Sequence, residues 1–264
     1  SSLLCALWGR MGMAMRIQVL SDVHLEFLRD KWRAWVDALD PSGVDVLVLA
    51  GDIHVGAGIK PSLKLFCERY PEVVFVAGNH EYYSSSPAEV EEYLGEAKAT
   101  SPNLHVLECS TVTIGGVRFA GTSLWFRDSP MNVSYQHMLN DFNLIEDFVP
   151  WVYGENQKAE AFLRAELSGP TPPDVIVTHH LPSDRCVVPQ YRGDPLNRFF
   201  VAPVADDIAE ECLPRFWCFG HTHGPNQFTV GSCRFACNPR GYPHERVQGF
   251  NPKLVFEVEP RPPT

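Results

Sequence analysis

The stretch that decides the fold is VDVLVLAGD at residues 44–52, an apolar run that ends in a glycine and an aspartate. Four more runs have the same build: RIQVLSDVH at 16–24, VVFVAGNHE at 73–81, DVIVTH at 174–179 and FWCFGHTH at 216–223. Unbroken apolar runs of this length are typical of strands covered on both faces. Ligands bind at the carboxyl ends of the strands in open α/β sheets. Five strand ends that carry Asp, His and Asn therefore predict one polynuclear metal site.

The side chains at these strand ends form a set of seven candidate metal ligands. They are Asp22, His24, Asp52, Asn79, His179, His221 and His223. One catalytic ion needs three or four ligands, so seven suit two ions that share a carboxylate. In an extended segment residues i and i+2 point to the same side, so the Asp-x-His and His-x-His pairs would each aim two groups into one cavity. Gly51, Gly78 and Gly220 precede ligands, where the backbone must turn sharply or approach closely.

The ligand types restrict the metal. Imidazole and carboxylate suit Mn, Fe, Zn, Ni or Co, with manganese favoured, and the lack of cysteine in the set argues against a structural zinc site. Taken alone, Asp52 or Asn79 is better explained as a helix N-cap after a strand than as a metal ligand. The metal interpretation depends on the whole ordered set.

That ordered set resembles the signature of the calcineurin-like metallophosphoesterase superfamily: Asp-x-His, Gly-Asp, Gly-Asn-His-Asp/Glu, a lone His, then Gly-His-x-His. All five blocks are present in order across residues 22–223, about three quarters of the chain. The resemblance implies an α/β fold of four layers, an αββα sandwich of two mixed β-sheets flanked by helices. It also implies an enzyme that hydrolyses phosphate monoesters or diesters.

The resemblance further implies a role for each matching position. One metal ion would be held by Asp22, His24, Asp52 and His223, and the other by Asp52, Asn79, His179 and His221, so that Asp52 bridges the two. His179 rather than His180 takes the ligand place, because the first His after the strand does so in similar proteins. His80 and Asp52 are the expected catalytic residues.

His80 matches the family's acid, which protonates the leaving oxygen or stabilises the transition state. Its expected partner is a carboxylate such as Asp22 or Glu81. Two cations lower the pKa of a shared water, and the resulting metal-bridging hydroxide would attack phosphorus.

The expected substrate contacts are Asn79, His80, His180, Arg185 and Arg240. The guanidinium of Arg240 suits a phosphate, because it can donate two parallel hydrogen bonds. A structural role for Arg240 within a turn is an equally good interpretation. For His180, a side chain that only packs against its neighbours is an equally good interpretation. We expect a small organic or nucleotide-like phosphate as substrate, because no large capping domain is evident. A Ser/Thr phosphoprotein phosphatase is the alternative, and a non-catalytic scaffold of the same fold is less favoured.

Composition narrows the partners. The 264 residues carry a net charge of −10, with 32 acidic against 22 basic residues, which argues against stable binding to nucleic acid. Eight cysteines without a Cys-x-x-Cys pair indicate a reducing, cytoplasmic compartment and no disulfide framework. No apolar run approaches the ~20 residues of a membrane span. Residues 1–14 are expected to be an upstream extension or an expression remnant, or else an extra edge segment, and residues 15–264 a single domain.

The rest of the chain alternates helical and hairpin patterns. Helical spacing is found at 32–39, at 87–97 behind a Ser86-Pro87-x-Glu89 capping box, and at 156–167. Hairpins are predicted at 111–119 and 227–237, and a last strand at 254–259. More than ten strands favour two packed sheets over one. Residues 126–155 and 182–203 fit no regular pattern, and long segments on a rigid scaffold often carry a binding surface.

Overall fold

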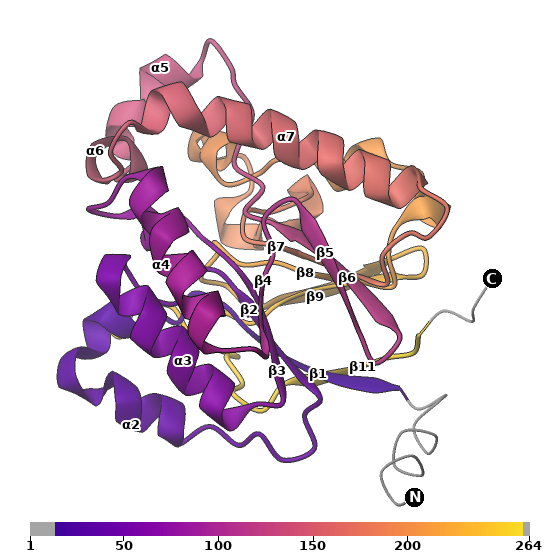
Figure 1. Cartoon of the computed structure of the whole chain (residues 1–264). Coiled ribbons are helices and arrows are strands. Elements are labelled where there is room, and N and C mark those ends of the chain that lie inside the picture. The colour runs from indigo at the N-terminus through magenta and orange to yellow at the C-terminus, as the bar shows by residue number, and fades with distance from the viewer. Residues whose placement is uncertain (1–13, 261–264) are drawn as a thin grey trace, which may run out of the picture.

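The computed structural model describes residues 14–260, which form two β-sheets of five and six strands with helices against them (Figure 1). The extension predicted over residues 1–14 lies, apart from residue 14, outside the described residues. Within 14–260 no helix is both long and apolar enough to cross a membrane.

The first sheet has the strand order β11-β1-β2-β3-β4. Its strands are β1 (Met15–Leu20), β2 (Val46–Ala50), β3 (Glu72–Val76), β4 (Leu104–Val106) and β11 (Val255–Val258). The pairs from β1 to β4 are parallel, and β11 pairs antiparallel with β1. The sheet is therefore mixed, as expected, and the parallel part carries the carboxyl ends of three ligand-bearing strands.

The second sheet has the order β5-β6-β7-β8-β10-β9. Its strands are β5 (Ser110–Ile114), β6 (Val117–Thr122), β7 (Val175–Thr178), β8 (Phe216–Cys218), β9 (Asn226–Val230) and β10 (Cys233–Cys237). β5 with β6, and β9 with β10, form the two predicted hairpins. β7 and β8 are parallel neighbours in the middle, so the two remaining ligand-bearing strands end side by side.

Helices connect the strands. The α-helices are α2 (Trp32–Asp37), α3 (Ile59–Arg69), α4 (Pro87–Thr100), α5 (Asn132–Tyr135), α6 (Asp141–Leu144) and α7 (Phe148–Ser168). Short 3-10 helices are η1 (Leu25–Lys31), η2 (Gly56–Gly58), η3 (His80–Tyr82), η4 (Gln136–Met138), η5 (Asp184–Cys186), η6 (Pro189–Tyr191), η7 (Pro195–Phe199), η8 (Val204–Asp207) and η9 (Glu210–Cys212). The predicted capping box at Ser86 and Glu89 is present at the start of α4.

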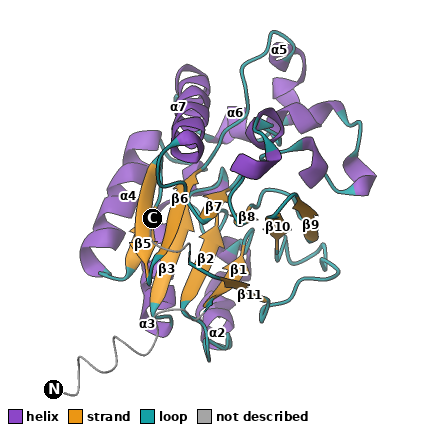
Figure 2. Cartoon of the chain, turned by 90° about the vertical axis from the view of Figure 1, so that its right-hand side faces the viewer, coloured by secondary structure: helices purple, strands orange, loops and turns teal. Residues whose placement is uncertain are grey.

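Three apolar cores separate four layers, which confirms the αββα prediction. Alternate residues of β2 face opposite ways: Leu47 packs toward the helices, and Val48 packs between the sheets. β7 does the same, with Val177 between the sheets and Ile176 packed with Leu163 of α7. Both views show α2, α3 and α4 beside the first sheet and α7 over the second (Figure 1; Figure 2).

Part of the segment at 126–155 is helical, contrary to the sequence pattern. α7 begins at Phe148, eight residues before the predicted start, and its buried residues Phe148, Val152 and Asn156 recur every fourth position. Pro150 hides this start, but a proline in the first helical turn removes no intrahelical hydrogen bond. β4, a strand of three residues, is also absent from the prediction.

The loops after the ligand-bearing strands of both sheets meet. His179, after β7, places its Nδ1 atom 2.9 Å from the carbonyl oxygen of Ala50 at the end of β2. The amide of Gly220, after β8, donates to the carbonyl of His179 at 2.9 Å. The first of these contacts joins the two sheets, and the second joins neighbouring strand ends of the second sheet, at the edge where the candidate site lies.

Candidate metal centre

Six of the seven predicted ligands fall into two groups. Asp22, His24 and His223 form the first group, and Asp52, His179 and His221 form the second. The donor atoms within each group lie within 4.8 Å of one another. The structure therefore brings together residues up to two hundred positions apart, in the two sets that the resemblance implies.

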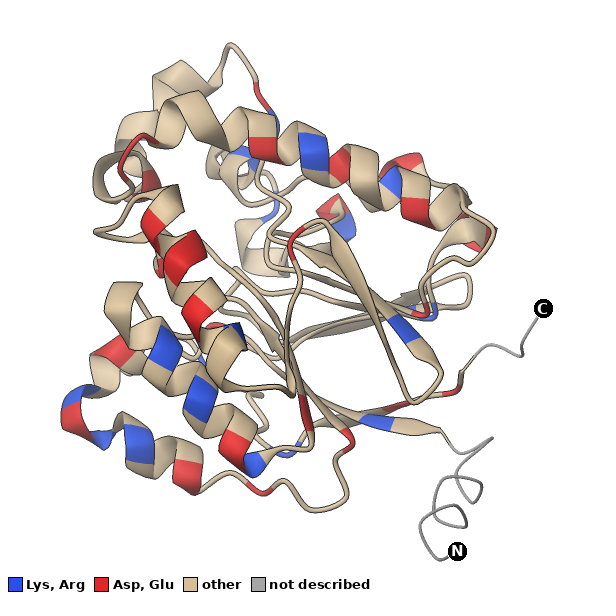
Figure 3. Ribbon diagram, viewed as in Figure 1, with Lys and Arg blue, Asp and Glu red and all other residues tan. Residues whose placement is uncertain are grey.

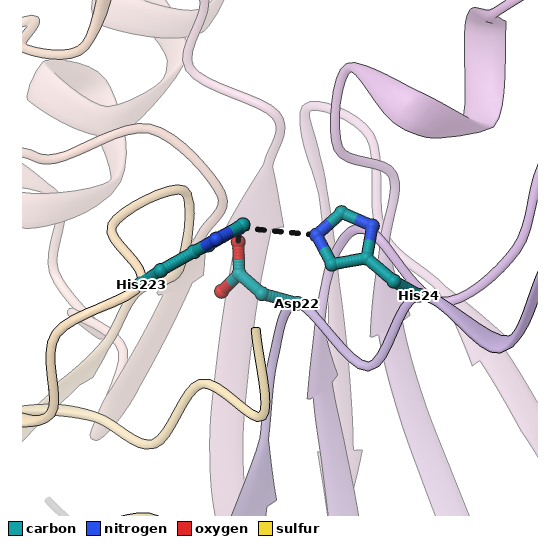
Figure 4. Close-up of side chains that lie close together, drawn as sticks. All are labelled: Asp22, His24 and His223. Atoms are coloured by element: carbon teal, nitrogen blue, oxygen red, sulfur yellow. Dashed lines mark hydrogen bonds and ion pairs between the residues drawn. The ribbon is translucent and has the colours of Figure 1, made fainter. Parts of the chain in front are cut away.

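The first group converges from two sides (Figure 4). His24 Nε2 and His223 Nε2 lie 3.1 Å apart, and His223 Nε2 lies 3.7 Å from Asp22 Oδ1. An ion about 2.1 Å from each donor would separate neighbouring donors by roughly 3–4 Å. The spacing therefore suits one ion.

Asp52 lies between the two groups. Its Oδ2 atom is 3.8 Å from His24 Nε2, and its Oδ1 atom is 3.4 Å from His179 Nε2. One carboxylate thus directs one oxygen to each group, as a bridging ligand does.

Asn79 completes the second group. Its Oδ1 atom lies 3.1 Å from His179 Nε2, while its Nδ2 atom donates to Asp141 Oδ1 at 2.9 Å and to the Tyr83 hydroxyl at 3.1 Å. These two acceptors fix the amide so that its oxygen faces the site.

Buried ligand atoms that lack a hydrogen-bond partner support a fit to metal ions. Asp22 is fully buried, and within residues 14–260 neither of its carboxylate oxygens makes a hydrogen bond of good geometry, although the Ser21 hydroxyl and the His221 amide lie nearby. Nε2 of His221 is likewise buried without a partner among the described residues. Such groups are costly unless a cation satisfies them. Burial, followed by the charge of Asp52, raises the pKa of Asp22.

Three imidazoles are held with Nε2 toward the site. Their Nδ1 atoms face acceptors: Ala50 O for His179 at 2.9 Å, Glu245 Oε2 for His223 at 2.6 Å and Glu26 Oε1 for His24 at 3.2 Å. Such partners set the tautomer of a metal-binding histidine. Burial lowers the pKa of His24 to about 3 and that of His179 to about 4, which favours the neutral form that binds metals.

His80 has a different carboxylate partner from those predicted. Its Nδ1 lies 3.1 Å from Glu26 Oε1, and its Nε2 lies 3.0 Å from the hydroxyl of Tyr242. Burial lowers its pKa, but the charges of Asp52 and Glu26 outweigh this and raise the pKa of His80 to about 9. The expectation of Asp22 or Glu81 as partner is wrong, because Glu81 is engaged by the backbone.

Glu81 accepts four backbone hydrogen bonds. The donors are the amides of Asp52 (2.9 Å), Ile53 (2.7 Å), His54 (3.1 Å) and Gly78 (2.6 Å). This fully buried carboxylate therefore holds the loops after β2 and β3 against each other.

Replacement of Glu81 by Ala is expected to lower the free energy of unfolding by on the order of 3 kcal/mol, because four backbone amides, three of them in buried hydrogen bonds, lose their acceptor. Urea denaturation of metal-free protein measures this. Glu81→Gln keeps an acceptor oxygen and should lose less. Glu91→Ala, at an exposed position on α4, is the matched control. An equal loss of unfolding free energy in both Ala variants would contradict the role of Glu81 in holding the two loops together.

Four of the candidate ligands have a left-handed backbone. The φ angles are 48° at Asp22, 49° at His24, 57° at Asp52 and 64° at His221. Each costs on the order of 1–3 kcal/mol in a non-glycine residue. The argument from an extended Asp-x-His segment is therefore wrong: Asp22 and His24 share a site because the chain turns sharply at each of them.

All three predicted close approaches are present, and a Cβ on Gly220 would lie 2.5 Å from the carbonyl oxygen of Ala50. A Cβ on Gly78 would collide with the carboxylate and the amide nitrogen of Asp52. A Cβ on Gly51, which has a φ of 83°, would collide with the imidazole of His179. Only glycine fits at these positions, as expected.

Asp141→Ala is expected to weaken metal binding at the second group by about 10- to 100-fold, the usual scale for removing a residue that orients a ligand. The carboxylate of Asp141 accepts hydrogen bonds from both Asn79 and Tyr83, at 2.9 and 2.7 Å. Calorimetric titration of apo protein with Mn²⁺ measures the two sites. Asp141→Asn retains an acceptor oxygen and should restore most of the affinity; unchanged affinity in the Ala variant would refute the role.

A cavity of about 350 Å³ opens in front of the two groups. Asp52, Asn79, His80, His221 and His223 are among its lining residues. Its other walls come from 138–141 and 187–200. These lie within the two long segments expected to carry a binding surface.

Three predicted substrate contacts lie elsewhere. Arg240 donates to the carbonyl of Val23 at 2.9 Å and lies over the ring of Trp35, and it does not line the cavity. Arg185 is exposed beside Glu210. His180 is fully buried, with Nδ1 3.1 Å from the Ser123 carbonyl. These positions favour the structural alternatives stated for Arg240 and His180.

Five residues around the ligands were missed: Glu26, Tyr83, Asp141, Tyr242 and Glu245. Glu26 stands two positions after His24, the one signal available in the sequence. Tyr242 lies two positions after Arg240, the residue of that turn for which a role was predicted.

Comparisons with known proteins agree with this geometry. The chain matches the family model of the calcineurin-like phosphoesterases over residues 15–225, and it belongs to that family. It is therefore a phosphoesterase, with His and Asp clusters suited to metal ions.

Relatives extend over nearly the whole chain. An uncharacterized protein of Acanthamoeba polyphaga mimivirus is 26% identical over 283 aligned positions, which cover 93% of this chain and 98% of that protein. The phosphopantetheinyl hydrolase of Mycobacterium tuberculosis has a similar fold, with a TM-score of 0.73, 19% identity and coverage of 95% of this chain and 98% of that one. A protein of Thermus thermophilus has a TM-score of 0.55, 12% identity and coverage of 94% and 100%. The structural likenesses support the fold.

Proposed function

We propose that this phosphoesterase hydrolyses a small organic phosphate ester at two metal ions held by the seven candidate ligands. The observation that carries the proposal is Asp52, whose two oxygens face His24 of one group and His179 of the other. When bound, the ions supply a nucleophile near neutral pH and offset the charge of the phosphoryl oxygens.

The protein residues supply the remaining chemistry. His80 lines the cavity, and Glu26 fixes its ring from the Nδ1 side. A proton on Nε2, beside the Tyr242 hydroxyl, is in place to pass to the leaving oxygen of the ester. Asn79 and His80 are the proposed phosphate contacts.

The size of the cavity supports a small substrate over a phosphoprotein. Its volume of about 350 Å³ lies at the low end of small-molecule sites, roughly 300–1,000 Å³. A Ser/Thr phosphoprotein phosphatase remains the alternative, and a scaffold without turnover is disfavoured because all seven ligands are present.

A substrate panel tests the proposal. It contains p-nitrophenyl phosphate, bis-p-nitrophenyl phosphate, 2′,3′- and 3′,5′-cyclic nucleotides and a phosphopeptide, each with added Mn²⁺. A phosphopantetheinyl ester enters as one candidate, because a protein of similar fold carries that name. We expect turnover of small esters. Turnover of the phosphopeptide alone would favour the alternative, and two bound metal equivalents without any turnover would indicate a scaffold.

Manganese and a cytoplasmic location belong to the proposal. The N and O ligands suit manganese, with iron, zinc, nickel or cobalt as alternatives, and anomalous scattering at the cavity would identify the metal. The seven cysteines within the described residues are free thiols, which supports a reducing compartment. Acidic and basic residues are interspersed along α3 and α7, which supports the expected lack of stable nucleic-acid binding (Figure 3).

A further inference from the structure

We infer that the cavity selects phosphate esters with one phosphate group and a largely apolar remainder that carries no second negative charge. The inference rests on the proposed function and names the substrate class for that site. Its basis is the chemistry of the cavity walls beyond the metal ligands.

Beyond the imidazole of His80, which the proposed function places at the reacting phosphate, the walls carry no cationic side chain. None of the lining residues is Lys or Arg, whereas Asp141, Asp194 and Glu245 are acidic. Two bound ions would compensate one phosphate, but a second anionic group would meet carboxylates. The site therefore disfavours diphosphates and carboxylate-bearing esters.

The nearest arginines do not alter this balance. Arg198 adjoins the lining residue Asn197, but its guanidinium lies over the ring of Tyr135, at 4.9 Å from the centroid, and its Nε donates to the carbonyl of Pro195. Arg192 is exposed and is not among the lining residues. Asp194 lines the cavity, and as the N-cap of η7 its side chain accepts a hydrogen bond from the amide of Leu196.

Apolar side chains from two segments line the cavity. Met138 and Leu139 line it from the segment before α6, and Val187, Val188 and Leu196 line it from the segment after β7. Met138 is 57% exposed, so its side chain is available to an apolar group in the cavity. Between these walls an alkyl or similarly apolar group leaves water, and an anionic group would lose its hydration without compensation.

Phosphonates with a single tail test the inference by binding. The probes are methyl-, pentyl- and 4-carboxybutylphosphonate, titrated into Mn²⁺-loaded protein by calorimetry. Each buried methylene contributes roughly a fourfold factor, so pentylphosphonate should bind about tenfold or more tighter than methylphosphonate. It should exceed the carboxybutyl compound of equal length by about tenfold or more, since that compound brings a second anion.

Variants of the wall give the matched controls. Leu196→Lys should reduce the preference for pentyl over carboxybutyl by about tenfold, and Met138→Lys, at an exposed position, serves if the first variant folds poorly. Arg192→Ala should leave the preference unchanged.

The outcomes separate the two proposals. Hydrolysis of bis-p-nitrophenyl phosphate, together with equal or undetectable binding of the pentyl and carboxybutyl compounds, overturns the inference and leaves the proposed function standing. If neither hydrolysis nor phosphonate binding occurs in protein that holds two metal equivalents, the proposed function fails and the inference fails with it.

Discussion

Asp52→Asn is expected to lower kcat/KM for every phosphate ester by a factor on the order of 10³ or more. The carboxylate of Asp52 faces both ligand groups, so its replacement by a neutral amide affects both at once. It also accepts a hydrogen bond from the amide of His80 at 2.9 Å, and a correctly oriented Asn keeps that acceptor. The variant should therefore fold but fail to hold both metal ions.

Metal content separates this effect from general damage. Elemental analysis should find about two equivalents in the parent protein and about one or fewer in Asp52→Asn. Asp128→Asn, at an exposed position, is the matched control for the Asp-to-Asn change and should keep both equivalents. Undiminished turnover by Asp52→Asn would falsify the bridging role.

His80→Ala is expected to lower kcat by a factor on the order of 10²–10⁴, the usual scale for general acid–base assistance, with both metal equivalents retained. Its imidazole lies against Glu26 and Tyr242, and it lines the cavity beside Asp52. Glu26→Gln should cause a smaller loss of about 10- to 100-fold, because it only orients the ring. Single-turnover kinetics with a p-nitrophenyl ester measures the chemical step.

Metal analysis of the same variant tests an alternative role for His80, in which its imidazole binds a metal ion. His24, Asp52 and His80 also form a group whose donor atoms lie within 4.8 Å. If His80 binds a metal ion itself, His80→Ala will lose an equivalent, and a leaving group with a low pKa will not rescue it. A proton donor predicts the reverse: two equivalents, and a smaller defect with p-nitrophenolate than with an alkoxide leaving group.

Sequence reasoning selected the candidate ligands because their positions follow from local rules. An apolar strand, a glycine and a polar residue at its carboxyl end can each be read in the chain, and parallel neighbours bring such ends to one edge. The ordered blocks then divided the ligands into two sets, and the structure gathers Asp22 with His223 and Asp52 with His221 in those sets.

The supporting residues were out of reach for a different reason. Glu245 and Asp141 lie in irregular or short helical segments, and their roles arise only where the folded chain sets them beside His223 and Asn79. Glu81 was noticed as part of the Gly-Asn-His-Glu block, but its use as an acceptor for four amides depends on the loop after β2. Likewise, the start of α7 is hidden by Pro150 and Gly154, whose poor helix propensity is overridden by the burial of Phe148 and Val152.

The left-handed backbone at four ligands has an evolutionary consequence. Asp22→Gly would relieve an unfavourable φ angle and remove a buried carboxylate, so the metal-free variant should melt at a higher temperature than its parent. Selection for robustness alone would therefore erode this site one residue at a time.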